Sequence, residues 1–178
     1  MRQYRDTTFR LKDQDCISLG LVGPEDRRRF LNGFERISVR TNINRFHTFK
    51  KHFSENELRY LLVIDNVNHL AIGAIDCQRP DIGIGLARYV RLSTDPSTAE
   101  AAIIVIDEYQ GKGLGGLLYS ELMHLAAING IQHLHNIVGK DNRNMLALLK
   151  KLGAHQVAEQ EHEYELVIDL PVHMRKTG

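Results

Sequence analysis

The chain has 178 residues, of which 43% are hydrophobic and 25% charged, a composition typical of globular proteins with one sizeable core. Its 23 basic and 22 acidic residues leave a formal net charge of +1, which excludes a protein that collects nucleic acid or anionic lipid through a strong overall field. The first residues are polar and no apolar run is long enough to span a membrane, so we expect neither a signal peptide nor a transmembrane segment.

The first half of the chain predicts one strand and then three helices. Residues 16–22 form an apolar run typical of a strand, and in residues 30–37 apolar side chains recur at the three- and four-residue steps of a helix. Residues 39–49 can also line one helical face. Ser54 and Glu57 have the spacing of a capping box, which predicts the start of a third helix.

The second half alternates strands and helices. Residues 69–75 and 82–92 predict two strands, and the apolar run 101–106 fits a strand buried on both faces. A leucine-striped helix follows the glycine-rich residues 110–115 and ends at Asn129-Gly130. The remaining predicted elements are a strand over 131–138, a helix capped by Asp141 or Asn142, and strands over 155–157 and 164–170.

This order predicts an α/β (α+β) protein with a central mixed twisted sheet of about seven strands flanked by helices. No linker or repeat is visible, so we expect a single domain over residues 1–178. Residues 1–13 would form an N-terminal extension, and residues 171–178 a C-terminal tail.

The two cysteines, Cys16 and Cys77, lie in apolar, strand-like contexts. Two cysteines are too few for a disulfide framework, so we expect reduced, buried thiols in a cytoplasmic protein. Cys77 as an acyl-carrying nucleophile would need an activating base, and nothing near it in the sequence supplies one.

The glycine-rich segment 110–115 reads Gln-Gly-Lys-Gly-Leu-Gly and connects a strand to a helix. A helix start exposes unpaired N–H groups, and glycine lets the backbone approach a phosphate closely. The segment lacks the Lys-Ser/Thr end of a P-loop, and its glycine interval differs from that of a dinucleotide-binding loop. We therefore predict a diphosphate cradle, although the same glycines would suit a purely structural turn.

Three blocks in order resemble the GNAT superfamily of acyl-CoA-dependent N-acyltransferases. The family pattern Gln/Arg-x-x-Gly-x-Gly/Ala is met by Gln110, Gly113 and Gly115. The apolar strand 101–106 precedes it, and a later block that begins with Asn142 and ends in Leu-Gly follows it. Further segments resemble the catalytic domain of Pat-type bacterial protein lysine acetyltransferases, at residues 44–46, 54–58, 69–71 and 99–101.

The resemblance implies the GNAT fold, acetyl-CoA as co-substrate and no metal. The pantetheine arm would pair with the strand before the loop like an added strand, and the diphosphate would take loop N–H groups with Lys112 as its charge partner. Asn142 would bond the pantetheine or a nearby backbone group in addition to capping its helix. The implied cofactor-binding residues are Ile104, Val105, Ile106, Gln110, Gly111, Lys112, Gly113, Leu114, Gly115 and Asn142.

Glu100 occupies the position of the catalytic glutamate in Pat-type enzymes. It precedes a six-residue apolar run, which predicts a carboxylate whose pKa is raised by burial, able to take a proton from the attacking amine. It could instead be a surface carboxylate at a strand start. Many GNAT enzymes have a tyrosine as general acid where the alignment places Leu149, so the general acid is unassigned and solvent could protonate the thiolate.

Other polar residues favour ordinary structural roles. His133 and His135 share one strand face but have no evident third metal ligand. Asp107 and Glu108 fit a solvated turn better than a base. The net basic stretch 25–51 fits a solvated helix face, and part of it could steer an acidic substrate or the 3′-phosphate of CoA.

These observations predict an N-acetyltransferase that moves an acetyl group from acetyl-CoA to an amine by direct attack. The first hypothesis for the acceptor is a protein lysine, such as one on a CoA ligase. The alternatives are a small amine (a polyamine, amino sugar or amino acid) and a non-catalytic acyl-CoA-binding sensor. We expect a monomer or homodimer with no nucleic-acid or membrane partner, and the sequence does not specify the acceptor or the acyl-chain length.

Overall fold

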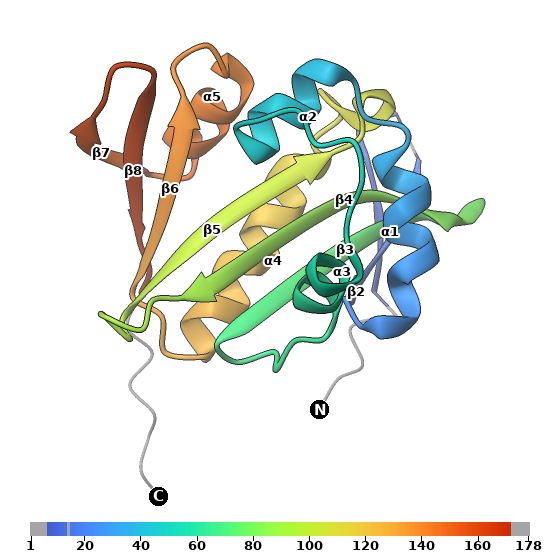
Figure 1. The fold of residues 1–178 in the computed structure, drawn as a ribbon, viewed down its shortest axis with the longest axis horizontal. Helices are drawn as coiled ribbons and strands as arrows, with labels where there is room; N and C mark the ends of the chain where they lie inside the picture. The colour runs from blue at the N-terminus through green and yellow to red at the C-terminus, as the bar shows by residue number, and fades with distance from the viewer. Residues whose placement is uncertain (1–6, 14, 172–178) are drawn as a thin grey trace, which may run out of the picture.

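The computed structural model describes residues 7–13 and 15–171, in which eight strands form one sheet of order β1-β2-β3-β4-β5-β6-β8-β7 (Figure 1). All neighbouring strands are antiparallel except β5 and β6, which are parallel. The predicted mixed α/β sheet flanked by helices is therefore confirmed. The strands are β1 (Thr7–Arg10), β2 (Cys16–Leu21), β3 (His69–Asp76), β4 (Arg79–Arg91), β5 (Thr98–Val105), β6 (His133–Gly139), β7 (His155–Glu159) and β8 (Glu163–Asp169).

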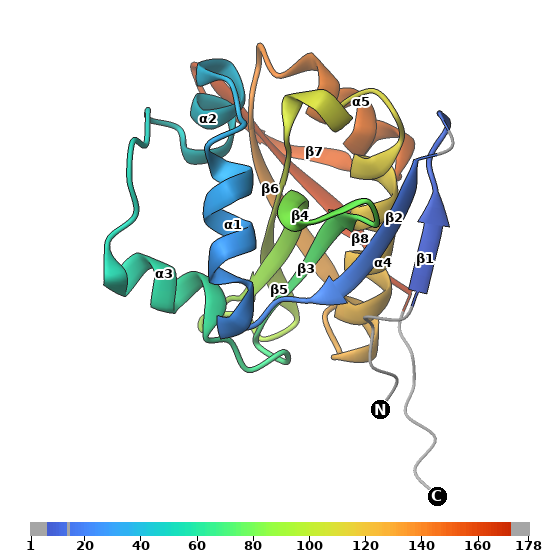
Figure 2. The same cartoon turned by 90° about the vertical axis from the view of Figure 1, so that its right-hand side faces the viewer.

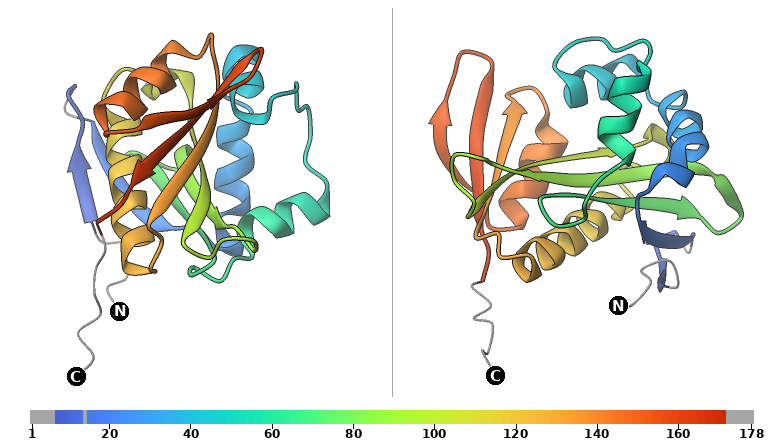
Figure 3. Two further views of the ribbon diagram at one scale, coloured as in Figure 1. Left: turned by 90° about the vertical axis from the view of Figure 1, so that its left-hand side faces the viewer. Right: turned by 60° about the horizontal axis from the view of Figure 1, so that its bottom comes forward.

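The helices cover both faces of the sheet. Figures 2 and 3 show α1, α2 and α3 on one face and α4 on the other. None of the helices in the described residues is long and apolar enough to cross a membrane. The helices are α1 (Arg27–Phe34), α2 (Val39–Phe46), α3 (Glu55–Leu62), α4 (Leu114–Ile128) and α5 (Arg143–Lys151), with short 3₁₀ turns η2 (Pro24–Asp26) and η3 (Asp107–Tyr109).

Local sequence signals explain how these helices start and pack. The Ser54–Glu57 capping box forms as predicted, because the Glu57 N–H donates to Ser54 Oγ (3.3 Å) and the Ser54 N–H to Glu57 Oε2 (2.8 Å). On α4, Leu114, Leu118 and Leu122 are fully buried against the sheet. Helix α1 lies so close to β4 that a Cβ on Gly33 would fall 2.1 Å from the Gly83 carbonyl oxygen. Glycine at position 33 is therefore a packing requirement.

The sheet is larger than predicted. Strand β1 lies in the expected N-terminal extension and pairs antiparallel with β2, which raises the strand number from the expected seven to eight. Its four residues, Thr-Thr-Phe-Arg, are too short and too polar to show an alternating pattern. Strand β5 begins at Thr98 instead of residue 101, because it pairs with β6 there. Of the expected tail, residues 172–178 lie outside the described residues.

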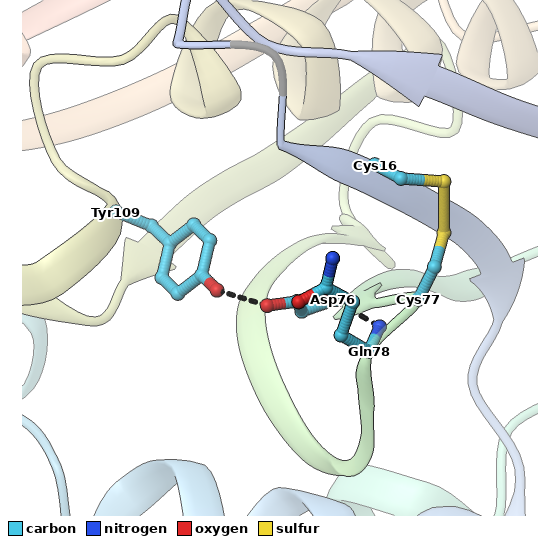
Figure 4. Close-up of a disulfide and its surroundings, with 5 residues drawn as sticks. All are labelled: Cys16, Asp76, Cys77, Gln78 and Tyr109. Atoms are coloured by element: carbon cyan, nitrogen blue, oxygen red, sulfur yellow. Dashed lines mark hydrogen bonds between the residues drawn. A yellow bond between two sulfur atoms is a disulfide. The ribbon is translucent and has the colours of Figure 1, made fainter.

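The two cysteines form a disulfide, so the prediction of two reduced, buried thiols is wrong (Figure 4). Strand pairing sets the Cys16 and Cys77 Cα atoms 5.5 Å apart, within the distance that a disulfide requires. The Cys77 N–H also donates to the Cys16 carbonyl oxygen (2.9 Å). The bond joins β2 to the end of β3, and a residue so engaged cannot serve as a nucleophile.

Candidate active site

Strands β5 and β6 pair over only three positions, from Thr98 opposite His133 to Glu100 opposite His135. Beyond Glu100 the two strands diverge, as Figure 1 shows, while β5 keeps its regular pairing with β4 up to Val105. A cleft of about 1290 Å³ opens between the diverging strands. The edge of β5 that faces this cleft therefore has no neighbouring strand after Glu100.

The open edge of β5 offers backbone groups to a ligand. The Ile106 N–H donates to a carbonyl oxygen of β4 (3.0 Å). Because successive residues of a strand point their N–H and C=O groups to alternate sides, Ile103 and Val105 point theirs into the cleft. Ile104 and Val105 line the cleft as expected, but Ile106 is buried outside it. Residues 102–105 are half-buried, so the expectation of a strand buried on both faces is wrong beside the cleft.

The glycine-rich loop has the shape of a phosphate cradle. Gly111 and Gly113 have φ angles of +74° and +99°, which favour glycine, and no atom lies within 4 Å of where their Cβ atoms would be. Helix α4 begins at Leu114, so the first N–H groups of the helix have no partner within it. The Leu114 side chain is fully buried, so only its backbone can take part. A Cβ on Gly115 would make ordinary contacts of 3.6 Å or more. The loop thus fits a diphosphate.

Gln110 and Asp107 hold the loop to helix α2. The Gln110 amide donates to Val105 O (2.9 Å) and to Thr41 Oγ1 (3.1 Å), so this side chain lines the cleft but is already engaged. Asp107 accepts from the Ser38 N–H (2.8 Å) and the Ser38 hydroxyl (2.7 Å) at the start of α2. Burial opposes ionisation of Asp107, but these hydrogen bonds outweigh it and lower its pKa. Asp107 is therefore an anchor, not a base.

Tyr109, which directly precedes the loop, is bonded to Asp76 at the end of β3 (Figure 4). Its buried hydroxyl donates to Asp76 Oδ2 (2.5 Å) and accepts from Arg79 Nη2 (2.6 Å). Burial raises the pKa of Tyr109, and the Asp76 carboxylate raises it further. Arg79 also donates to Glu108 Oε1 (2.6 Å). The end of the β3–β4 hairpin, next to the Cys77 disulfide, thus supports the residues that precede the loop.

Lys112 does not point into the cleft, which corrects its expected role as charge partner of the diphosphate. Its Nζ lies 2.5 Å from Asp13 Oδ2 and 3.0 Å from Asp15 Oδ2, and these hydrogen bonds raise its pKa. Lys12 lines the cleft instead, and its N–H approaches the Lys112 carbonyl oxygen (3.5 Å). Lys12 was missed because it lies about 100 positions before the loop and carries no local motif.

The cleft is basic although the chain is nearly neutral. Six basic side chains line it against three acidic ones. Within the part of the chain that the structure describes, Lys12, Arg40 and Arg143 form no ion pair. Such a lining suits a ligand with several phosphates. The basic residues are Lys12, Arg40, Arg45, Lys140, Arg143 and Lys151, and the acidic residues are Glu100, Asp107 and Asp141.

Glu100 lies at the point where the strands diverge and lines the cleft. It is exposed, so the expected burial of this carboxylate is wrong: only its neighbours in the strand are buried. On the same face of the sheet are two guanidinium groups whose charges it offsets. Burial lowers the pKa of Arg45 to about 10, and the nearby Arg88 adds to this effect. Arg88 is itself buried over the Tyr60 ring (5.0 Å). The carboxylate therefore lies in a positive environment.

Asn142 and Leu149 occupy their expected helix but differ in role. Asn142 Oδ1 accepts from the Met145 N–H (3.2 Å), which confirms the helix cap, and Asn142 also lines the cleft. Leu149 is fully buried in the core and has no access to a leaving thiolate. The general acid stays unassigned. His133 and His135 each face one carboxylate, and the described residues contain no cluster of three possible metal ligands.

The chain is similar to known acetyltransferases in sequence and in fold. A sequence profile described as the acetyltransferase (GNAT) family matches residues 27–154. The chain is 32% identical to Acetyltransferase Pat from Mycolicibacterium smegmatis over 157 residues, covering 84% of this chain and 44% of that protein. It is 30% identical to Acetyltransferase PA5475 from Pseudomonas aeruginosa over 144 residues, covering 80% and 77%. The crystal structure of the GNAT domain of S. lividans PAT has the same fold, with a TM-score of 0.85, 21% identity and coverage of 92% and 96%.

Proposed function

Because the chain belongs to the GNAT family of acetyltransferases, we propose that it moves an acetyl group from acetyl-CoA to the ε-amino group of a protein lysine. The observation that carries the proposal is the divergence of β5 and β6, with a glycine cradle at one end and Glu100 at the other. The chain spans less than half of the Mycolicibacterium smegmatis Pat protein. The lysine acceptor therefore rests on similarity to its acetyltransferase part.

The residues that would hold acetyl-CoA follow from the cleft. The diphosphate would accept from the N–H groups of residues 111–115, and Lys12, which lines the cleft, would be its cationic partner. The pantetheine arm would pair with the open edge of β5 at Ile103 and Val105, as an added strand does. Asn142 would face it from the α5 side. This path brings the thioester toward Glu100, because β5 runs from Glu100 to the loop.

The reaction would be direct acyl transfer. A lysine ammonium has a pKa near ~10.4, so it must lose a proton before it attacks, and Glu100 or a water bonded to Glu100 would take that proton. The amine nitrogen then bonds to the thioester carbon, the carbon–sulfur bond breaks, the CoA thiolate leaves, and the nitrogen loses its second proton to solvent to give the amide. Solvent would protonate the thiolate, because Leu149 cannot.

The test is a thiol-release assay with acetyl-CoA against CoA-ligase proteins, lysine peptides and small amines. We expect a protein lysine to react, and Glu100→Gln to lower turnover by about 10²–10⁴-fold without weakening acetyl-CoA binding. Glu161→Gln, in the exposed turn between β7 and β8, is the matched control. An unchanged rate for Glu100→Gln would remove Glu100 from the mechanism.

The same assay separates the alternatives. Turnover with a polyamine, amino sugar or amino acid but with no protein would replace the lysine acceptor by a small amine. Acetyl-CoA binding by calorimetry without thiol release from any amine would identify a sensor. The absence of binding to CoA and acetyl-CoA would reject all three hypotheses.

A further inference from the structure

A second cavity of about 290 Å³ lies between helices α1 and α2 and the face of the sheet that they cover. Its lining is mainly apolar, with three phenylalanine rings and small residues of the sheet. The rings of Phe34 and Phe46 pack edge to face at 6.0 Å, and both lie on the cavity wall. The large apolar side chains of its wall include Phe30, Phe34, Phe46, Leu61, Leu86 and Ile104.

The apolar cavity meets the cleft at two residues. Ile104 of β5 and Arg45 of α2 line both spaces. Ile104 is opposite Leu86 in the β4–β5 register, and both side chains belong to the α1–α3 face of the sheet, as does Glu100. The cavity therefore opens beside the part of β5 that lies between the glycine loop and Glu100, where the thioester would lie.

Arg45 separates the two spaces but is not locked in place. Its guanidinium lies 5.1 Å from the Phe46 ring centroid and makes no hydrogen bond or ion pair within the described residues. Burial disfavours its charge, in keeping with a pKa lowered to about 10. A long side chain whose head group is held by no hydrogen bond or close ion pair can move aside for an apolar group at small cost.

We propose that this apolar cavity holds the acyl chain of the co-substrate, so that the protein accepts linear acyl-CoA thioesters longer than acetyl-CoA. The inference rests on the proposed function. The chemistry is unchanged: the acyl carbon leaves the CoA sulfur and bonds to the amine nitrogen, the amine proton goes to Glu100, and the thiolate leaves. The chain beyond the carbonyl carbon extends past Ile104 between α1, α2 and the sheet.

The dimensions and the lining fit this occupant. An apolar protein cavity of about 150 Å³ is large enough for benzene, so a cavity about twice that size can hold a chain of roughly six carbons. Each methylene that leaves water contributes roughly fourfold to affinity. Hexanoyl-CoA has four more chain carbons than acetyl-CoA, which predicts tighter binding by about 10- to 100-fold once losses of chain freedom are included.

The test is isothermal titration of the full chain with CoA, acetyl-CoA and hexanoyl-CoA, which needs no acceptor. The proposed function is judged by whether CoA and acetyl-CoA bind, and the cavity proposal by the ratio of hexanoyl-CoA to acetyl-CoA affinity. A ratio of 10 or more supports the proposal, and equal affinities overturn it.

Cavity-filling variants test where the acyl chain of hexanoyl-CoA lies. Leu86→Phe fills the cavity and should lower the hexanoyl-CoA to acetyl-CoA affinity ratio to about 1, with acetyl-CoA affinity retained. Leu125→Phe, on α4 and outside both spaces, is the matched control and should keep the ratio. If Leu86→Phe does not fold, Leu61→Phe fills the same cavity from α3. If the ratio of hexanoyl-CoA to acetyl-CoA affinity stays high after the cavity is filled, the acyl chain lies elsewhere and the proposal is overturned.

Discussion

The two cavities that meet at Ile104 differ in how they are built. The cleft between β5 and β6 is open, basic and lined in part by backbone groups, whereas the cavity under α1 and α2 is apolar and lined by side chains. The cleft would recognise the part of CoA that every acyl-CoA shares. The apolar cavity would recognise the part that varies. The gap between β5 and β6 would thus recognise CoA in general, and the space between the sheet and its covering helices would select among acyl chains.

The proposed role of the cleft in CoA binding is tested most severely at the glycine cradle. Gly113→Val should abolish acetyl-CoA binding, because Gly113 has φ +99° and its missing Cβ faces open space that the phosphate would occupy. Calorimetry measures the affinity. Gly130→Val is a matched control at the other end of α4, with φ +81° and equally open surroundings.

The two valine variants share the backbone cost of a left-handed conformation, about 1–2 kcal/mol. Both should therefore lose similar stability, but only the variant at the cradle should lose acetyl-CoA. If Gly113→Val retains binding, or if Gly130→Val loses it to the same extent, the loop does not hold the diphosphate.

The disulfide lies nearer the apolar cavity than the cleft, because residues of the two strands that it joins, β2 and β3, line part of that cavity. The Cys16→Ser/Cys77→Ser double variant should lose up to about 4 kcal/mol of unfolding free energy, the chain-entropy value for closing a segment of 61 residues. Urea unfolding measures the loss. Acetyl-CoA affinity should stay within about twofold, because the cleft does not contain either cysteine.

A large loss of affinity in this double variant would have a structural route. Asp76 adjoins Cys77 and accepts from Tyr109, which directly precedes the loop (Figure 4). Such a result would contradict the independence of the two cavities and place the control of the cradle in the Asp76–Tyr109 hydrogen bond.

The sequence predicted the cleft better than the apolar cavity, for a physical reason. Glycine at a strand-to-helix turn restricts the backbone locally, so the loop and the Asn142 cap were predictable from short patterns. The direction of Lys112, the exposure of Glu100 and the burial of Ile106 depend on neighbours distant in the chain. Periodicity alone carries no such information.

The same limit applies to the cavity wall and the disulfide. The sequence places Phe34 and Phe46 only on the apolar faces of two predicted helices. The cavity that their rings line arises from the packing of α1 and α2 on the sheet. The register of β2 with β3, which sets Cys16 beside Cys77, is equally invisible in a single sequence.

A smaller effect is expected from the basic residues of the cleft. Lys12→Gln should weaken acetyl-CoA binding by roughly tenfold, and less at high salt, because it removes one cation from a solvated phosphate site. Lys112→Gln is the matched control and should leave affinity within about twofold while lowering the melting temperature, because Asp13 and Asp15 lose their partner. The reverse pattern would restore Lys112 as the phosphate ligand.

The smallest expected effect on acetyl-CoA binding comes from the pH titration of His69, on the α1–α3 face of the sheet. His69 has a buried Nε2 with no hydrogen-bond partner in the described residues, and burial, aided by the Arg88 charge, lowers its pKa from 6.5 to about 4. The folded protein therefore binds a proton at His69 less readily than the unfolded chain does.

Stability from this residue is present above pH 6.5 and is lost as the pH falls toward 4, by at most about 1.4 kcal/mol per pH unit. Urea unfolding across this range should show a flatter profile for His69→Gln, and identical profiles would mean that the pKa of His69 is the same in the folded and unfolded states. Acetyl-CoA affinity should not follow this titration, because His69 lines neither the cleft nor the apolar cavity.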